Sequence, residues 1–108
     1  MPSSMLNFEF NNNAPLKVIA GPCQIESKDH AMMMAEIIYG ICLDLGVRLV
    51  FKSSFDKANR SSLKGKRGVG IDEGLKILSD IKSKFDIPVL TDIHAPEQAS
   101  VVAEVVDV

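Results

Sequence analysis

Short apolar segments alternate with segments of helical periodicity along most of the chain, and this alternation limits the possible folds more than any other feature. The apolar segments are too apolar to face water on either side, so we expect buried parallel strands joined by helical crossovers, an α/β fold. The expected strands are 16–20, 47–51, 88–93 and 105–108, and the expected helices lie between Ser27 and Gly46, from 71 to 85 and from 96 to 104.

The first expected helix carries signals at both ends. Ser27 is a suitable N-cap, Asp29 lies in the first turn where the helix dipole favours an acid, and Gly46 suits the position just after the last turn. A stripe at helical spacing, including Cys42 as a core residue, runs along it. The stripe comprises Ala31, Met34, Ala35, Ile38, Ile41, Cys42 and Leu45. A similar stripe marks the second helix, which Gly74 is expected to weaken locally.

The two ends of the chain indicate its place in a larger fold. Residues 6–10 alternate apolar and polar, and 11–15 are typical of a turn, so 1–15 is expected to form an extension with a hairpin. The chain has 108 residues and ends on an apolar segment, whereas a (β/α)8 TIM barrel needs about 250. We therefore expect 1–108 to be the N-terminal portion of one barrel domain, with roughly three and a half β/α units. A complete small open α/β domain is the alternative.

Residues 52–70 form a cationic loop on an otherwise acidic chain. They hold six basic residues and one acid, a net charge of +5, while the whole chain carries −2. The basic residues are Lys52, Lys57, Arg60, Lys64, Lys66 and Arg67. Lysine, arginine, asparagine and serine together suit the phosphate and carboxylate groups of a small molecule.

The composition excludes several other classes of protein. A net charge of −2 disfavours general nucleic-acid binding, and the cationic loop is too short and too poor in aromatic residues to change that interpretation. No apolar run approaches the roughly 20 residues of a membrane helix, and the N-terminus does not resemble a signal peptide. Cys23 and Cys42 make no disulfide framework, so we expect a reducing, cytoplasmic location.

Reactive side chains follow the expected strands at one end of the sheet. Cys23 and Glu26 follow the first, Lys52 the second, and Asp92 and His94 the third. Ligands of parallel α/β proteins bind beyond the carboxyl ends of the strands. We therefore expect an active site at this rim.

Three segments resemble the 3-deoxy-D-manno-octulosonate 8-phosphate synthase family. They are Val18–Ser27, Phe51–Ser62 and Leu90–Pro96, and the run Lys-Ala-Asn-Arg-Ser-Ser within the second is highly specific. The resemblance implies a (β/α)8 barrel that is usually a tetramer. It also implies a transferase that condenses phosphoenolpyruvate with arabinose 5-phosphate and releases phosphate, for lipopolysaccharide biosynthesis in the cytoplasm.

The resemblance also assigns roles to individual residues. Lys52 and Lys57 match positions that contact phosphoenolpyruvate, with Lys57 between the two substrates. Asp92 matches a carboxylate near the aldose hydroxyls, so Lys57 and Asp92 are the catalytic candidates. The clamp on the aldose phosphate, on a site shared with a neighbouring subunit, matches Asn59, Arg60 and Ser61.

Cys23 points to a metal-dependent class of this family. A second class, which needs no metal, has asparagine at this position, so the resemblance implies that Cys23 binds a divalent ion such as iron, zinc or manganese. One thiolate cannot hold a metal firmly, and the expected His, Glu and Asp partners would lie beyond Val108. Taken without the resemblance, a single cysteine is more often a small buried residue.

Other interpretations stay open from the sequence. A related synthase of 3-deoxy-heptulosonate 7-phosphate would use erythrose 4-phosphate, although its Lys-Pro-Arg-Thr-like motif differs from the residues at 52–55. The chain could also be a non-catalytic phosphosugar-binding module, and the 108 residues alone are expected to be inactive. His94 is either catalytic or a structural hydrogen-bonding residue, and Glu26 either orients its loop or caps the helix.

Overall fold

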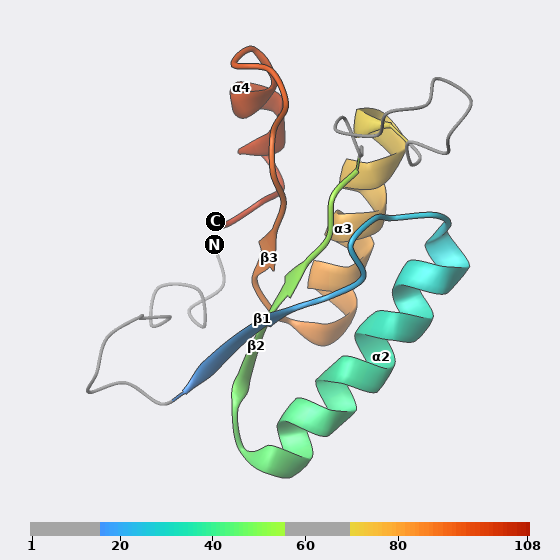
Figure 1. Cartoon of the computed structure of the whole chain (residues 1–108), viewed down its shortest axis with the longest axis vertical. Coiled ribbons are helices and arrows are strands. Elements are labelled where there is room, and N and C mark those ends of the chain that lie inside the picture. Colours follow the sequence, from blue (N-terminus) through green and yellow to red (C-terminus); the bar gives the residue numbers. More distant parts are fainter. Residues whose placement is uncertain (1–15, 56–69) are drawn as a thin grey trace.

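The computed structural model describes residues 16–55 and 70–108 as an α/β unit (Figure 1). Each of the first two strands is followed by a long helix. In chain order the elements are β1 (Lys17–Ala20), α2 (Lys28–Leu45), β2 (Arg48–Lys52), α3 (Ile71–Phe85), β3 (Val89–Leu90) and α4 (Gln98–Val102). The expected strand at 6–10 lies outside the described residues.

The three strands form one parallel sheet with β2 in the middle. Ile19 of β1 pairs with Val50 of β2, and Phe51 of β2 pairs with Val89 of β3. All three strands therefore run in the same direction, and their carboxyl ends lie at the same edge of the sheet. The crossover helices α2 and α3 lie on the same side of the sheet (Figure 1). The predicted parallel α/β arrangement is confirmed for the described residues.

The ends of α2 follow the predicted capping pattern. The Ser27 hydroxyl accepts a hydrogen bond from the His30 amide at 3.1 Å, which satisfies one of the free N–H groups of the first turn. Gly46 adopts the left-handed conformation, with φ of 70°, and its N–H bonds back to the last turn. Both residues therefore define the helix as expected.

The main core lies between the sheet and the two long helices, and it contains Cys42 as predicted. It is built from apolar side chains of every element except α4. The buried members include Ala31, Ala35, Cys42, Leu49, Phe51, Ile77, Leu78, Ile81 and Val89. A second, smaller cluster of Phe55, Leu75 and Val102 joins the end of β2 to α3 and α4.

Gly74 has a packing role that the sequence did not reveal. A Cβ atom at this position would lie 2.5 Å from the Cβ of Phe55, so only glycine lets α3 approach the residues that follow β2. The local weakening expected from helix propensity is therefore offset by a close contact beside the candidate site.

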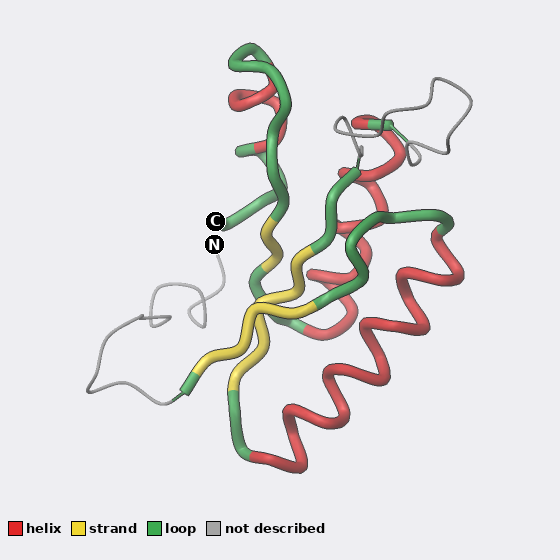
Figure 2. The backbone as a smooth tube through the Cα atoms, in the orientation of Figure 1, coloured by secondary structure: helices red, strands yellow, loops and turns green. Residues whose placement is uncertain are grey.

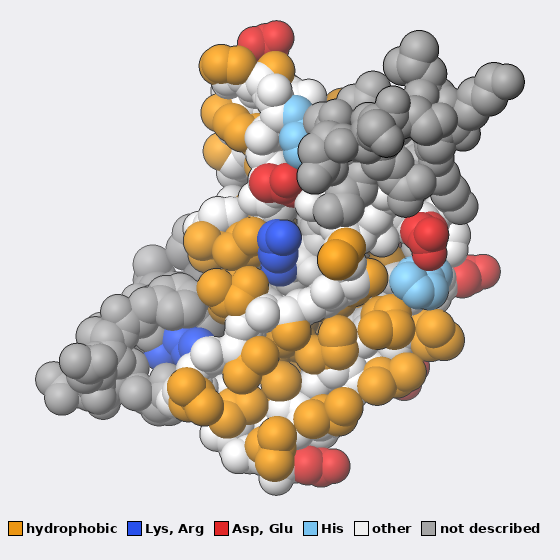
Figure 3. Space-filling view, in the orientation of Figure 1, with side chains coloured by type: hydrophobic (Ala, Val, Ile, Leu, Met, Phe, Trp, Pro, Cys, Tyr) orange, Lys and Arg blue, Asp and Glu red, His pale blue; other side chains and the backbone are white. Residues whose placement is uncertain are grey.

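The predicted apolar stripe of α2 is wrong at two of its members. Ile41 is 53% exposed and Leu45 is 70% exposed, although Ala31, Ala35 and Cys42 are buried as expected. Met33 and Ile37, which lie at helical spacing from Ile41, are exposed too. The resulting hydrophobic surface over α2 is visible in Figure 3.

Two elements near the C-terminus are shorter than predicted, and one does not form. β3 covers only Val89–Leu90 because it pairs with β2 only at Phe51 and Lys52, and α4 ends at Val102. Residues 105–108 form no strand (Figure 2). Asp107 donates one main-chain bond to Val89 O, at 3.1 Å, which is too little pairing for a strand. None of the described helices has the length and apolarity needed to cross a membrane.

Candidate active site at the carboxyl ends of the strands

The chain segments that follow β1, β2 and β3 meet at one rim, as predicted. Gln24 forms a parallel bridge with Ser54 beyond the regular strands, and the Ser54 amide bonds the Cys23 carbonyl at 3.2 Å. On the other side of β2, Ser53 N donates to Leu90 O at 3.3 Å. Beyond the regular strands, individual main-chain hydrogen bonds therefore join the loops that carry the candidate residues.

Gly21 allows the first two of these segments to approach closely. A Cβ atom at Gly21 would lie 1.9 Å from the carbonyl oxygen of Lys52, which is main chain and cannot move aside. Glycine is therefore required where β1 ends. Because it has no side chain, the main chain of Lys52 can lie directly beside the turn that leads to Cys23.

Ser53 and Thr91 tie the three segments together through their hydroxyl groups. The Ser53 hydroxyl donates to Pro22 O at 2.6 Å, and the Thr91 hydroxyl donates to Ser53 O at 2.7 Å. Ser53 is fully buried. Because each bond joins neighbouring strands, the rim is held by side chains where the regular ladder has ended.

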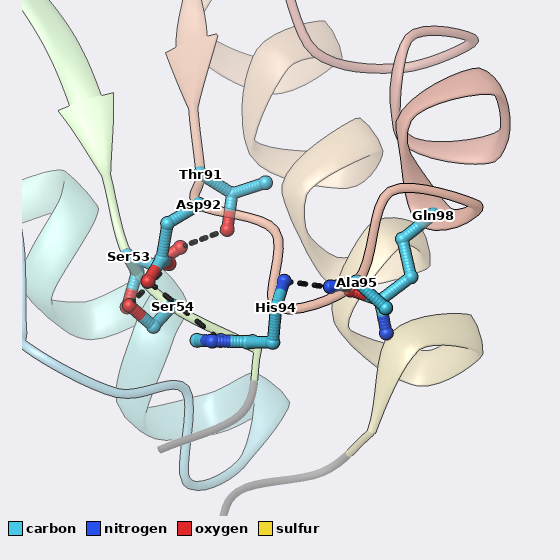
Figure 4. A network of polar contacts seen from close by, with 7 residues as sticks. All are labelled: Ser53, Ser54, Thr91, Asp92, His94, Ala95 and Gln98. Atoms are coloured by element: carbon cyan, nitrogen blue, oxygen red, sulfur yellow. Dashed lines mark hydrogen bonds and ion pairs between the residues drawn. The ribbon is translucent and has the colours of Figure 1, made fainter. Parts of the chain in front are cut away.

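Asp92 is held by two polar side chains (Figure 4). The Ser54 hydroxyl donates to its Oδ1 at 2.6 Å, and His94 Nε2 lies 3.6 Å from its Oδ2, an ion pair when the imidazole is protonated. The Asp92 side chain remains 46% exposed. The carboxylate is therefore fixed on one side and open to a ligand on the other.

The loop after Asp92 has its own anchor. Gln98 Oε1 accepts hydrogen bonds from His94 N at 2.8 Å and Ala95 N at 3.2 Å (Figure 4). The Phe55 ring meets the imidazole of His94 edge-on, with 5.8 Å between centroids. These contacts give His94 a structural setting, while a catalytic role for its imidazole stays a prediction.

Lys52 brings a half-buried cation to the rim. It is the last residue of β2 and pairs with Leu90, whose strand leads to Asp92. Among the described residues no carboxylate lies within ion-pair distance of its amine. A lysine with no ion-pair partner among residues 16–55 and 70–108 is suited to an anionic ligand.

Comparison with known proteins gives the family of this chain. The sequence model of the DAHP synthetase I family matches residues 7–108. The chain belongs to the DAHP synthetase I family.

Individual members of the family that resemble this chain carry a more specific name than the family model. The chain is 56% identical over 99 residues to the 2-dehydro-3-deoxyphosphooctonate aldolase of Agrobacterium fabrum, a match that covers 92% of this chain and 35% of the relative. It is 55% identical over 102 residues to the protein of the same name from Brucella ovis, covering 94% of this chain and 37% of the relative. The chain thus spans about a third of the length of the curated relatives that it matches.

Cys23 lies at the rim with an exposed, free thiol. This setting suits a metal ligand better than the small buried residue that a single cysteine usually is. Within 16–55 and 70–108, however, no three His, Cys, Asp or Glu side chains gather to hold a metal ion. The described part of this family member therefore offers one fitting donor and not a complete site.

Several predicted residues of the family's substrate site cannot be placed. Lys57, Asn59, Arg60 and Ser61 lie outside the described residues. Glu26 is described and exposed, and its Oε2 lies 4.0 Å from His30 Nδ1 in the first turn of α2. This contact places Glu26 beside the first turn of α2, whose N-cap is Ser27, and a role for Glu26 stays a prediction.

Sequence reasoning missed the polar residues that connect the rim. Ser53, Ser54 and Thr91 are bonded between strands, and Gln24 is buried with no hydrogen-bond partner for its carboxamide among the described residues. The available signal was two serines directly after an apolar strand. A small hydroxyl that follows a buried strand has to find a partner there.

Proposed function

We propose that this chain is part of a synthase that condenses phosphoenolpyruvate with D-arabinose 5-phosphate to give 3-deoxy-D-manno-octulosonate 8-phosphate and phosphate. The observation that carries the proposal is that Lys52 and Asp92 lie at the carboxyl ends of neighbouring strands, at one rim of the sheet. The identity of 55–56% to proteins named 2-dehydro-3-deoxyphosphooctonate aldolase supports the choice of product.

The proposed fold of the whole protein is a (β/α)8 barrel, with 1–108 as its N-terminal portion and 1–15 as an extension. Three parallel strands with two helices on one side correspond to the start of such a barrel. Ile19 of β1 is 50% exposed, and Ile37 and Ile41 of α2 are 51% and 53% exposed. Strands and helices of the remaining barrel would bury these surfaces.

Charge neutralisation is the first task of the proposed site. Phosphoenolpyruvate brings a phosphate and a carboxylate, and the aldose brings a second phosphate, so the groups repel one another until fixed cations hold them. We assign Lys52 and Lys57 to phosphoenolpyruvate. We assign the aldose phosphate to Asn59, Arg60 and Ser61, of which the arginine can bind it through two N–H groups.

The bond changes follow from the substrates. The methylene carbon of phosphoenolpyruvate attacks the aldehyde carbon, forming the new carbon–carbon bond, and the aldehyde oxygen takes up a proton. A water molecule adds to the central alkene carbon, and the resulting hemiketal phosphate loses its phosphate group by carbon–oxygen cleavage. Asp92 would orient the aldose through its hydroxyls, and Lys57 would stabilise the negative charge on the aldehyde oxygen.

Cys23 is the proposed protein ligand of a divalent ion, iron, zinc or manganese. Its exposed thiol at the rim supports this assignment, and the His, Glu and Asp ligands that the resemblance implies would lie beyond Val108. When bound, the ion would supply a Lewis acid at the rim. For the whole protein we also propose a homotetramer in the cytoplasm, acting in lipopolysaccharide biosynthesis.

A matched pair of loop substitutions tests the substrate assignment in the complete protein. Arg60→Ala should raise KM for arabinose 5-phosphate at least tenfold, because a charged hydrogen bond of about 1.5–3 kcal/mol is lost. Lys64→Ala, which removes another cation of the same loop, should change it less than twofold. Equal effects of the two substitutions would show that the loop acts through its general charge and not through a clamp.

One observation favours a second candidate. The matching family model carries the name of synthetases of 3-deoxy-heptulosonate 7-phosphate, which use erythrose 4-phosphate. The run Lys-Ala-Asn-Arg-Ser-Ser and the names of the relatives favour the five-carbon aldose. A direct comparison of the two aldoses as substrates decides between them.

A further inference from the structure

Ser54 connects the three strand ends that carry the candidate site residues. Its amide donates to Cys23 O at 3.2 Å, and its carbonyl accepts from Ile25 N at 2.8 Å. Its hydroxyl reaches the opposite way and donates to Asp92 Oδ1 at 2.6 Å. One residue thus bonds the segment after β1 through its main chain and the segment after β3 through its side chain.

The side chain of Ser54 is well placed to fix the carboxylate of Asp92. Ser54 is only 3% exposed, so water does not compete for the hydroxyl, and a short bond to an ionised acceptor is the strong kind of hydrogen bond. With Oδ1 held, Oδ2 is directed to the side where His94 Nε2 lies 3.6 Å away (Figure 4). The carboxylate plane is therefore set by a serine and an imidazole from two different segments.

Ser53 shows what a purely structural hydroxyl does at the same place. It is as buried as Ser54 and its hydroxyl bond to Pro22 O is equally short, at 2.6 Å, but that acceptor is main chain. Loss of the Ser53 hydroxyl would free a carbonyl, whereas loss of the Ser54 hydroxyl would free the carboxylate of Asp92. Comparing substitutions of these two serines therefore distinguishes a residue that only stabilises the rim from one that positions Asp92.

We propose that Ser54 is a positioning residue that fixes the Asp92 carboxylate in the orientation that receives the hydroxyl groups of the aldose. This inference rests on the proposed function, because it assumes that Asp92 binds the aldose. Ser54→Ala keeps both main-chain bonds and removes only the bond to Asp92. The carboxylate then loses the partner of Oδ1 and keeps only His94 beside Oδ2, so binding of the aldose has to restore its orientation.

The test is a double-mutant cycle in the complete protein, with KM and kcat measured for each substrate separately. Ser54→Ala should raise KM for arabinose 5-phosphate by roughly ten- to a hundredfold, the range of a hydrogen bond to a charged group, and leave KM for phosphoenolpyruvate within about twofold. Ser53→Ala should leave both within about twofold. Ser54→Ala combined with Asp92→Ala should be no worse than Asp92→Ala alone, since the serine acts through the carboxylate.

Two further measurements keep the inference open to refutation if a variant is unstable. Asp92→Leu removes the acceptor of the Ser54 bond and keeps a side chain of similar shape, so it can replace Asp92→Ala in the cycle. Crystal structures of the wild type and Ser54→Ala, without substrate, should show the Asp92 carboxylate ordered in the first and rotated or disordered in the second. An unchanged carboxylate would overturn the inference, as would additive effects in the cycle or equal effects of Ser53→Ala and Ser54→Ala.

Failure of the inference and failure of the proposed function give different results. If the wild type releases no phosphate with either aldose, the proposed function is wrong, and the two crystal structures alone decide whether Ser54 positions Asp92. If the wild type is active and the Ser54→Ala kinetics match the wild type, the function stands and the positioning role falls.

Discussion

Substitution of Gly74 by alanine should destabilise the protein, against the usual direction of such a change in a helix. In an open helix interior, alanine is more favourable than glycine by about 1 kcal/mol. At Gly74 the new Cβ atom would lie 2.5 Å from Phe55 Cβ and 3.5 Å from its Cα, whereas carbon atoms in contact prefer roughly 3.5–4.0 Å. The close contact therefore has to open by about 1 Å.

The neighbouring residue has little freedom to make that room. Phe55 is 1% exposed, and its Cβ is fixed to the main chain, so no change of rotamer relieves the contact. Overpacking of this kind costs about 1–3 kcal/mol, and we expect the upper part of that range. After the helix gain is subtracted, Gly74→Ala should be less stable than the wild type by about 2 kcal/mol.

Gly40 supplies the matched control. It lies in the interior of α2, and a Cβ atom there would meet nothing within 4 Å. Gly40→Ala should therefore stabilise the protein by about 0.5–1 kcal/mol, the propensity gain alone. Urea unfolding midpoints of the two variants, compared with the wild type at an unchanged m value, give both numbers.

Gly74→Ala should also lower the activity of the candidate site. Phe55 follows Ser54 directly and its ring contacts His94, so displacement of Phe55 should lower the rate of phosphate release in Gly74→Ala and leave Gly40→Ala unaffected. Stabilisation of both variants by similar amounts would refute the packing argument. Destabilisation of Gly74→Ala with full activity would refute the link from α3 to the site.

Three other substitutions test separate parts of the account. Gly21→Ala should lose soluble, active protein, because its Cβ would lie 1.9 Å from a main-chain oxygen of β2; wild-type yield and activity would contradict this. Cys23→Ser should lose bound metal in elemental analysis while Cys42→Ser, in the core, keeps it, and equal metal content would remove the ligand assignment. Lys82→Met should lower the free energy of unfolding by about 1–3 kcal/mol, because Lys82 Nζ donates to Asp107 Oδ1 at 2.9 Å; an unchanged urea midpoint would mean that the pair contributes nothing.

Features that depend on neighbouring residues in the chain were predictable from the sequence. Ser27 and Gly46 mark the ends of α2 because a cap needs only its own turn of helix. The location of Lys52 and Asp92 at one rim followed from the parallel sheet, since all carboxyl ends of parallel strands lie on the same side.

Features that depend on distant contacts were not predictable. Ile41 and Leu45 fit the helical stripe, but their burial depends on what packs beside α2. Gly74 looked like a weak point because helix propensity carries no information about Phe55, nineteen positions earlier. The bond from Ser54 to Asp92 joins residues 38 positions apart, and no local pattern could indicate it.

The most direct test of the central claim is phosphate release from phosphoenolpyruvate by the complete protein. Arabinose 5-phosphate and erythrose 4-phosphate are offered separately, each with and without a chelator. The account predicts release only with arabinose 5-phosphate, lost on chelation and restored by a divalent metal. Release with erythrose 4-phosphate instead would contradict the substrate assignment, activity that survives chelation would contradict the metal, and no release with either aldose would favour a non-catalytic phosphosugar-binding protein.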